Sequence, residues 1–167
     1  MFKTIVEIRE RVYELGKNID APLDLLNVPD KSAGDGSPHL EVKGDIYHYV
    51  ASERGNEIFR KETTDSDELL YWIFSDVTTS MAYSYELKHR RPNQDFRRLA
   101  FSKRIELLEK LNPKWADREA KEIEKSLMDS PFDDDADLRV ALYEDFISKG
   151  LSDEDAYKKA CLKYPLP

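Results

Sequence analysis

The fold is decided by residues 63–98, TTDSDELLYWIFSDVTTSMAYSYELKHRRPNQDFRR, whose apolar residues are too dense to form a single helical stripe. The acidic residues within 65–68 are typical of a helix start, where the helix dipole favours negative charge. Pro92 ends the pattern, because proline cannot continue a helix. The stretch therefore predicts one long helix from about Ser66 to Arg90, apolar over more than half of its circumference and central to the fold.

The composition is typical of a globular protein. The chain has 167 residues, of which 40% are hydrophobic and 11% aromatic, and a chain of this length buries about two-thirds of its unfolded surface. Its formal net charge of -8 at pH 7 disfavours nonspecific binding to nucleic acids or acidic membranes by the molecule as a whole. The single cysteine, Cys161, excludes an intrachain disulfide and a cysteine-based zinc site. No stretch has the pattern of a signal peptide or a membrane-spanning helix, so we expect a soluble, cytoplasmic protein.

The residues before the long helix predict a helix, a loop and a small sheet. Residues 2–17 have the apolar spacing of an amphipathic helix. Residues 18–38 hold three prolines and two glycines, which predicts a loop with one turn at residues 23–26. Residues 39–62 alternate apolar and polar side chains between two groups of turn residues, as in a three-stranded antiparallel meander.

The first of these turns sets the register of the sheet. A two-residue loop at residues 44–45 places Leu40 opposite Tyr49 and Val42 opposite Tyr47, on one apolar face. The opposite face is mixed in character, and we expect either a helix or a partner to lie on it. Its residues are Glu41, Ile46, His48, Val50 and Phe59.

The residues after the long helix predict further helices with a break among them. The helical patterns cover residues 95–111, 113–127, 137–149 and 152–163, and an acidic break, SPFDDDAD, covers residues 130–137. The expected fold is α+β and mainly helical, with one long central helix and a small three-stranded antiparallel meander. We expect a single domain over residues 1–167, in which residues 136–167 form a C-terminal helical extension packed on residues 1–135.

The chain lacks the sequence signatures of catalysis and of metal or cofactor binding. The HExxH, P-loop, GxSxG and GxGxxG patterns are absent, and the three histidines do not have the spacing of a metal site. We therefore expect no cofactor, no metal and no enzymatic activity. One enzymatic alternative stays open, a small hydrolase that uses His48 with Glu41 or Glu53.

Basic residues are in local excess over residues 86–118. This excess leaves open a nucleic-acid-binding adaptor that uses Lys88–Arg104 together with neighbouring aromatic residues. However, Glu86 and Arg90 have the i,i+4 spacing of a helical ion pair, and Asp95 lies close in sequence to arginines on either side. An internal network of ion pairs that joins two helices is therefore the favoured interpretation.

Five strings taken together resemble the Immunity protein 63 family, a group predicted from bacterial polymorphic-toxin loci. They are IYHYVASERGNE at 46–57, TTDSDELLYWIFSDVT at 63–78, AYSYELKHR at 82–90, QDFRRLAF at 94–101 and ELLEKLNPKW at 106–115. The resemblance extends from the first predicted helix to about Asp135. It implies an α+β immunity protein that binds and neutralises a cognate bacterial toxin domain by stoichiometric capture and is not an enzyme.

The resemblance implies no particular toxin-contact residues, so the contact surface is predicted from charge. Many toxin domains act on nucleic acids and are basic, and long-range attraction steers an acidic inhibitor to such a partner. The acidic break and its flanks carry this negative charge beside aromatic side chains that can anchor an interface. The residues expected to contact the partner are Asp129, Phe132, Asp133, Asp134, Asp135, Asp137 and Tyr143.

Overall fold

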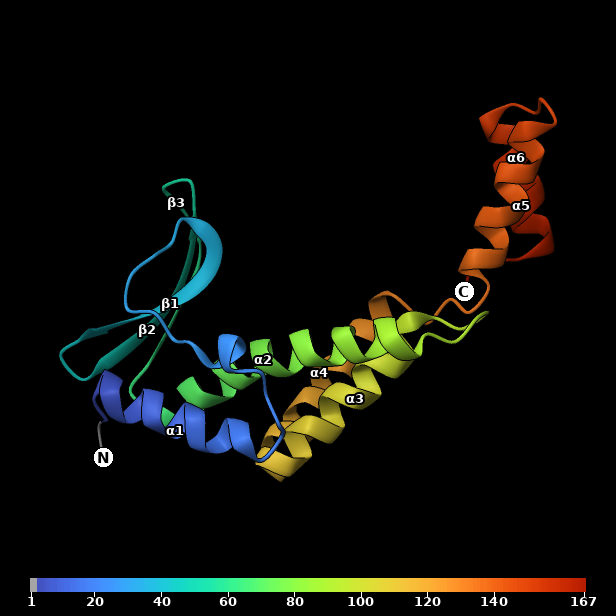
Figure 1. Ribbon diagram of the computed structural model, residues 1–167. Coiled ribbons are helices and arrows are strands. Elements are labelled where there is room, and N and C mark those ends of the chain that lie inside the picture. The colour runs from blue at the N-terminus through green and yellow to red at the C-terminus, as the bar shows by residue number, and fades with distance from the viewer. Residues whose placement is uncertain (1–2) are drawn as a thin grey trace. The chain divides into compact units, whose positions relative to one another are not determined.

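A computed structural model describes residues 3–167 (Figure 1). Its elements, in chain order, are α1 (Ile5–Lys17), the 3-10 helix η1 (Leu23–Leu26), β1 (Asp35–Lys43), β2 (Ile46–Glu53), β3 (Asn56–Thr63), α2 (Ser66–His89), α3 (Phe96–Leu111), α4 (Pro113–Asp129), α5 (Ala136–Ser148) and α6 (Asp153–Lys163). The strands form one antiparallel sheet in the order β1-β2-β3. The predicted class, α+β and mainly helical with an antiparallel meander, is confirmed.

Contacts within the chain group its residues into two compact units. The N-terminal unit holds residues up to Met81 together with Leu107–Trp115, and the C-terminal unit holds Ala82–Glu106 together with Ala116–Pro167. Consequently α2, α3 and α4 each contribute residues to both units. The single domain, and the packing of residues 136–167 on the preceding residues, stay predictions.

α2 is the long helix that residues 63–98 predict. It runs over 24 residues, Ser66–His89, and ends one residue before the expected Arg90. The six consecutive residues from Leu69 to Phe74 are each at most 8% exposed, so this part of α2 is buried all round within the N-terminal unit. The burial follows from the dense apolar pattern, since a helix with no polar stripe is stable only when other elements surround it.

α1 begins at Ile5 because Thr4 caps it. The Thr4 hydroxyl accepts a hydrogen bond from the Glu7 backbone N–H at 3.3 Å, and the Glu7 carboxylate accepts one from the Thr4 N–H at 2.7 Å. This reciprocal pair satisfies two backbone donors that the first helical turn leaves free. The helix start expected at Phe2 lies outside the described residues. The prediction followed the apolar periodicity of residues 2–17 and did not identify Thr4 as the cap.

The sheet has the predicted register at its first turn. Leu40 lies opposite Tyr49, and Val42 lies opposite Tyr47, because Gly44 adopts φ 61°, a left-handed conformation that suits a two-residue turn. The turn expected at residues 23–26 is confirmed as η1. β1 nevertheless starts at Asp35, so the expected loop over residues 18–38 is wrong in its last four positions.

Phe59 lies on the opposite face of the sheet from the one predicted. A regular pairing from the second turn would place Phe59 opposite Val50, on the mixed face. The register shifts between Ala51 and Ser52, so that Phe59 instead lies opposite Ala51, and its ring centroid lies 6.0 Å from that of Tyr49. One extra residue in a strand turns every later side chain to the other face, which moves Phe59 to the apolar side.

The apolar face of the sheet packs on α2 through aromatic rings. The ring of Tyr49 lies 6.4 Å from that of Trp72, and Lys61 places its ammonium 5.7 Å from the Trp72 ring. On another side of α2, Trp115 stacks at 6.0 Å from Phe74. These contacts bring β2, β3, α2 and the start of α4 into one aromatic core, all within the N-terminal unit.

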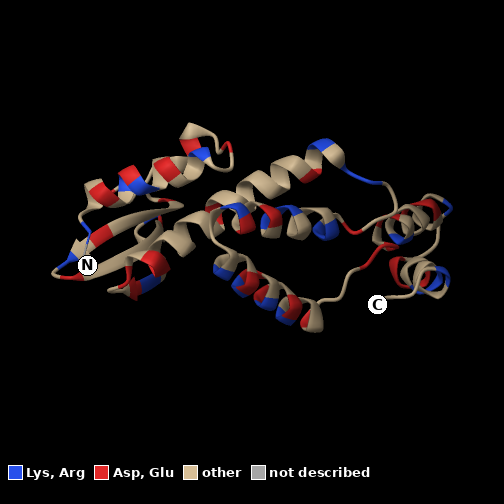
Figure 2. Cartoon of the chain, turned by 90° about the horizontal axis from the view of Figure 1, so that it is seen from below, with Lys and Arg blue, Asp and Glu red and all other residues tan. Residues whose placement is uncertain are grey.

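The C-terminal unit buries fewer large apolar side chains and more charged side chains than the N-terminal unit. Its buried hydrophobic residues are small with the exception of Ile123, and they are Ala82, Ala100, Ala116, Ile123, Ala156 and Ala160. Buried charged residues of this unit include Glu86, Asp95, Glu119 and Arg139. Figure 2 shows acidic and basic positions interspersed along the helices. Half-buried apolar side chains, among them Leu99, Leu138, Leu142 and Phe146, complete the packing of this unit.

Candidate functional site

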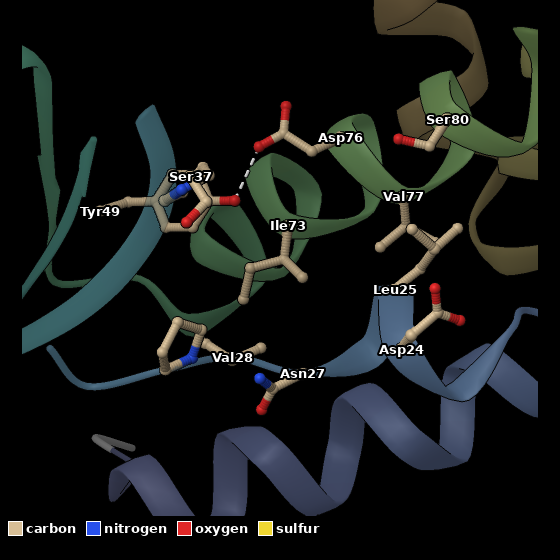
Figure 3. Close-up of a pocket in the computed structure, with 12 residues that line it drawn as sticks. Asp24, Leu25, Asn27, Val28, Ser37, Tyr49, Ile73, Asp76, Val77 and Ser80 are labelled. Atoms are coloured by element: carbon tan, nitrogen blue, oxygen red, sulfur yellow. Dashed lines mark hydrogen bonds between the residues drawn. The ribbon is translucent and has the colours of Figure 1, made fainter. Parts of the chain in front are cut away.

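A cavity of about 360 Å³ opens in the N-terminal unit between α2, β2 and the segment that joins α1 to β1 (Figure 3). Four separate parts of the sequence form its wall. The lining residues are Asp24, Leu25, Asn27, Val28, Pro29, Ser37, Pro38, Tyr49, Ile73, Asp76, Val77 and Ser80. A hollow of this size is at the lower end of the roughly 300–1,000 Å³ that is usual for ligand pockets, so it suits a small group or one side chain.

The floor of the cavity is apolar. Ile73 and Val77 are one helical turn apart on α2 and are 3% and 4% exposed, and Figure 3 shows both side chains pointing from α2 toward the η1 segment. Val28 and Pro38 line the same hollow from the connecting segment and from β1. An apolar floor of this kind gains free energy when it covers the hydrocarbon part of a ligand.

The rim of the cavity is polar and negatively charged. Tyr49, which is 5% exposed, donates a hydrogen bond from its hydroxyl to Asp76 Oδ2 at 2.7 Å (Figure 3). Burial raises the pKa of Tyr49 far above its usual value, and the nearby Asp76 charge raises it further, so the phenol keeps its proton and remains a donor. Asp24 supplies a second carboxylate, and no lysine or arginine is among the described residues that line the cavity.

Asp133 and Asp134, two of the residues expected to contact a partner, form ion pairs inside the C-terminal unit. The Arg139 guanidinium lies 2.7 Å from Asp133, and the Arg98 guanidinium lies 2.8 Å from Asp134. These arginines hold the pKa of each carboxyl below its usual range. The charges of Asp133 and Asp134 are therefore largely neutralised by arginines that no local sequence pattern assigned to them.

The other expected contact residues have different surroundings. Asp129, Asp135 and Asp137 are exposed. Phe132 is half-buried beneath the Arg98 guanidinium, which lies 4.2 Å from the centre of its ring. Tyr143 is half-buried and donates a hydrogen bond to Asp153 at 3.4 Å.

A second hollow of about 270 Å³ brings some of these acids together. Asp133, Asp134 and Asp137 line it with Arg90 and Arg97, whereas the expected contacts Asp129, Phe132, Asp135 and Tyr143 do not. Because arginines and aspartates both line the wall, this hollow lacks the single sign of charge that the N-terminal cavity has.

The basic segment forms ion pairs, as predicted, but the pairs of Glu86 and Asp95 are local, and the link between two helices is made by Arg104 of α3 with Glu119 of α4. Arg90 bonds both oxygens of Glu86, at 2.8 and 2.9 Å, and Arg97 lies 2.7 Å from Asp95. Lys103 pairs with Glu106, and Arg104 pairs with Glu119. Cations that are already paired with carboxylates are poor ligands for phosphates. The paired cations of this segment, Arg90, Arg97, Arg98, Lys103 and Arg104, therefore do not favour a nucleic-acid groove.

The structure pairs His48 with a residue that the hydrolase alternative did not include. His48 Nδ1 lies 3.0 Å from Glu62, whereas Glu41 bonds His39, Lys43 and Arg60. The imidazoles of His39 and His48 are 5% and 7% exposed. Each keeps one buried ring nitrogen without a hydrogen-bond partner among the described residues.

Within residues 3–167 no set of three or more histidine, cysteine or acidic side chains is arranged to hold a metal ion. Among the same described residues, no helix is both long enough and apolar enough to span a bilayer.

The cavity was not predicted from the sequence. Asp24 and Asp76 are 52 positions apart, and no local motif joins them. The one available signal was Asp76 itself, an acid within the apolar half of the long helix.

Comparison with known protein families gives a match to an immunity-protein family. The family model described as Immunity protein 63 matches residues 44–125, which include β2, β3, α2, α3 and most of α4. No curated protein and no solved structure matches the chain significantly.

Proposed function

Because the chain belongs to the Immunity protein 63 family through its residues 44–125, we propose that it is an immunity protein that neutralises a cognate bacterial toxin by stoichiometric capture. The family match is the observation that carries this proposal. In the proposed mechanism the protein acts in the cytoplasm of the cell that makes the toxin. It occupies a surface of the toxin and carries out no chemistry of its own.

The close aromatic packing of the N-terminal unit supports capture as the mechanism. A surface binds most tightly when it loses little conformational freedom on association. The aromatic contacts around Trp72 and Trp115 hold the sheet and α2 in one arrangement. In this proposal α2 is the central scaffold that presents the contact surfaces.

The acidic character of the chain supports a basic partner. The net charge of -8 accelerates encounter with a positively charged toxin through long-range attraction. For the C-terminal unit we propose that the contact uses the exposed Asp129, Asp135 and Asp137, with Phe132 and Tyr143 as apolar anchors. Asp133 and Asp134 contribute to this surface by ordering it through their arginine partners.

Capture is tested by co-expressing the chain with the toxin-like product of the neighbouring gene. We expect a one-to-one complex to co-purify, and protection of the cells to saturate at one equivalent of the chain. Absence of both a complex and protection would overturn the proposal. Protection by a small fraction of an equivalent would also contradict it, because that result requires turnover.

Charge reversal tests the acidic contact. Replacing Asp129, Asp135 and Asp137 with lysine should slow association with the toxin about tenfold at low salt, and the loss should shrink as salt screens the charge. A control with the same change in net charge reverses exposed acids elsewhere in the C-terminal unit, namely Asp117, Glu124 and Glu144. Equal association rates for both variants at low salt would remove this surface from the proposed interface.

A further inference from the structure

We propose that the cavity of the N-terminal unit receives an arginine side chain of the captured protein. That the arginine belongs to a captured toxin rests on the proposed function. That the occupant is an arginine rests on the chemistry of the cavity. The cavity combines an apolar floor at Ile73 and Val77 with carboxylates at Asp24 and Asp76. This combination matches a side chain that has a hydrocarbon stem and a cationic end.

The floor fits the stem of an arginine. Three methylene groups precede the guanidinium, and such a stem gains free energy by covering apolar surface while its charged end stays at the rim. Val28, Ile73 and Val77 are each at most 5% exposed, although they line an open hollow. Because these three side chains expose little surface, the apolar area that the stem can cover lies mainly on the half-buried Leu25, Pro29 and Pro38 of the same wall.

The rim fits the guanidinium. The Tyr49 hydroxyl donates a hydrogen bond to Asp76 Oδ2. This bond orients the Asp76 carboxylate and leaves its Oδ1 available to a ligand. Asp24, Asn27 and Ser80 are exposed at the same hollow. Within the described part of the chain, the side chains of these three residues make no hydrogen bond or ion pair. A guanidinium carries five N–H donors in a planar fork, so it can make paired hydrogen bonds to either of the two carboxylates that line the hollow, Asp76 or Asp24.

Charge selects arginine over other occupants. The described residues of the wall include two carboxylates and no lysine or arginine. The cavity therefore attracts cations and repels anions such as phosphates and acidic peptides. A lysine ammonium is more strongly hydrated than a guanidinium, so it loses more solvation free energy when it enters the hollow. The acidic rim thus agrees with the basic partner expected for a protein of this net charge.

The chemistry of the cavity is tested on the full chain by NMR titration with N-acetyl-arginine amide, followed through the methyl groups of Val28, Ile73 and Val77. We expect saturable shifts in the millimolar range, which is usual for one isolated side chain. N-acetyl-lysine amide should bind more weakly, and the neutral isostere N-acetyl-citrulline amide should cause no saturable shift. Equal shifts with the citrulline compound, or none with the arginine compound, would overturn the proposal.

Variants of the rim supply the second arm of the test. The double change Asp24→Asn and Asp76→Asn keeps the shape of the cavity and removes its charge, so it should weaken binding of the arginine compound about tenfold. The matched control is Asp45→Asn, which removes an exposed acid from a turn of the same unit. Far-UV circular dichroism of both variants verifies that they are folded.

The same variants separate this inference from the proposed function. If the toxin is captured and Asp24→Asn with Asp76→Asn weakens capture about tenfold while Asp45→Asn does not, both proposals are supported. If capture is unaffected by the double change, the inference fails and the immunity function stands. If no toxin is captured although the arginine compound binds, the proposed function fails, and with it the toxin as the source of the arginine.

Discussion

Replacing Tyr49 by phenylalanine removes a single oxygen from the wall of the cavity and leaves the ring that packs on Trp72 and Phe59. The hydroxyl donates to Asp76 at 2.7 Å, and a hydrogen bond to a charged group contributes about 1.5–3 kcal/mol. Water can rehydrate Asp76 in the variant, since this residue is exposed. We therefore expect Tyr49→Phe to lower the free energy of unfolding at pH 7 by about 1–1.5 kcal/mol.

The size of this loss depends on pH in a defined direction. Burial and the Asp76 charge raise the pKa of Tyr49 in the folded state, whereas an unfolded tyrosine has a pKa of about 10. Above that pH the unfolded state releases the proton that the folded state keeps, so the unfolded state binds fewer protons and stability falls as pH rises. The contribution of Tyr49 to the free energy of unfolding is thus complete below pH ~10 and decreases by about 1.4 kcal/mol per pH unit above it.

The two effects cancel near pH 11. At about pH 11 the wild type has lost roughly 1.4 kcal/mol of the Tyr49 contribution, so the variant should then equal it in stability. Urea unfolding of both proteins between pH 7 and 11, followed by circular dichroism, measures the difference. The control Tyr13→Phe removes a hydroxyl from a side chain that is 41% exposed. A difference that stays constant over this pH range would refute the buried, Asp76-bonded hydroxyl.

Three further changes probe other parts of the chain. Gly16→Ala should destabilise the protein by about 1–3 kcal/mol, measured by urea unfolding, because a methyl group there would meet Leu26 Cδ2 at 2.7 Å; unchanged stability would show that Leu26 can move aside. Arg139→Met should lower the free energy of unfolding by about 3 kcal/mol, because it leaves Asp133 without its partner. Arg139 also donates to the carbonyls of Tyr164 and Pro165, just after α6, so amide hydrogen exchange in α6 should increase in the variant. Unaltered protection of these amides would contradict this role of Arg139. Lys43 and Arg60 lower the pKa of Glu41 to about 2, so the stability that Glu41 contributes is present above pH ~4.5 and is lost as pH falls toward 2. In urea unfolding between pH 5 and 2, Glu41→Gln should therefore lose less stability than the wild type. The same loss in both proteins would count against the pairing.

The elements that follow from local pattern were predicted well. The long helix over Ser66–His89 came from a dense apolar run with an acidic start, and both features lie within the helix itself. The pairing of Leu40 with Tyr49 came from one two-residue turn. Such features need only the periodicity of nearby residues, because the backbone geometry of helices and hairpins is short-ranged.

Features that depend on distant residues were missed. Phe59 changed face because of one register shift after the second turn, and nothing in the strand sequence marks where the extra residue sits. Asp134 was predicted as a contact for a partner, and the sequence did not indicate that it pairs with Arg98, 36 positions away. Ion pairs of this kind are decided by which helices meet.

The type and order of the elements, the first hairpin register and the resemblance to the Immunity protein 63 family could be read from contiguous strings of residues. The pairing of the acids with arginines, and the hollow that Tyr49, Asp76 and Asp24 line, could be seen only in the folded chain. The difference lies in the range of the interactions. Backbone conformation is set by neighbours along the chain, whereas the charge and shape of a binding site are set by side chains that folding brings together from separate segments.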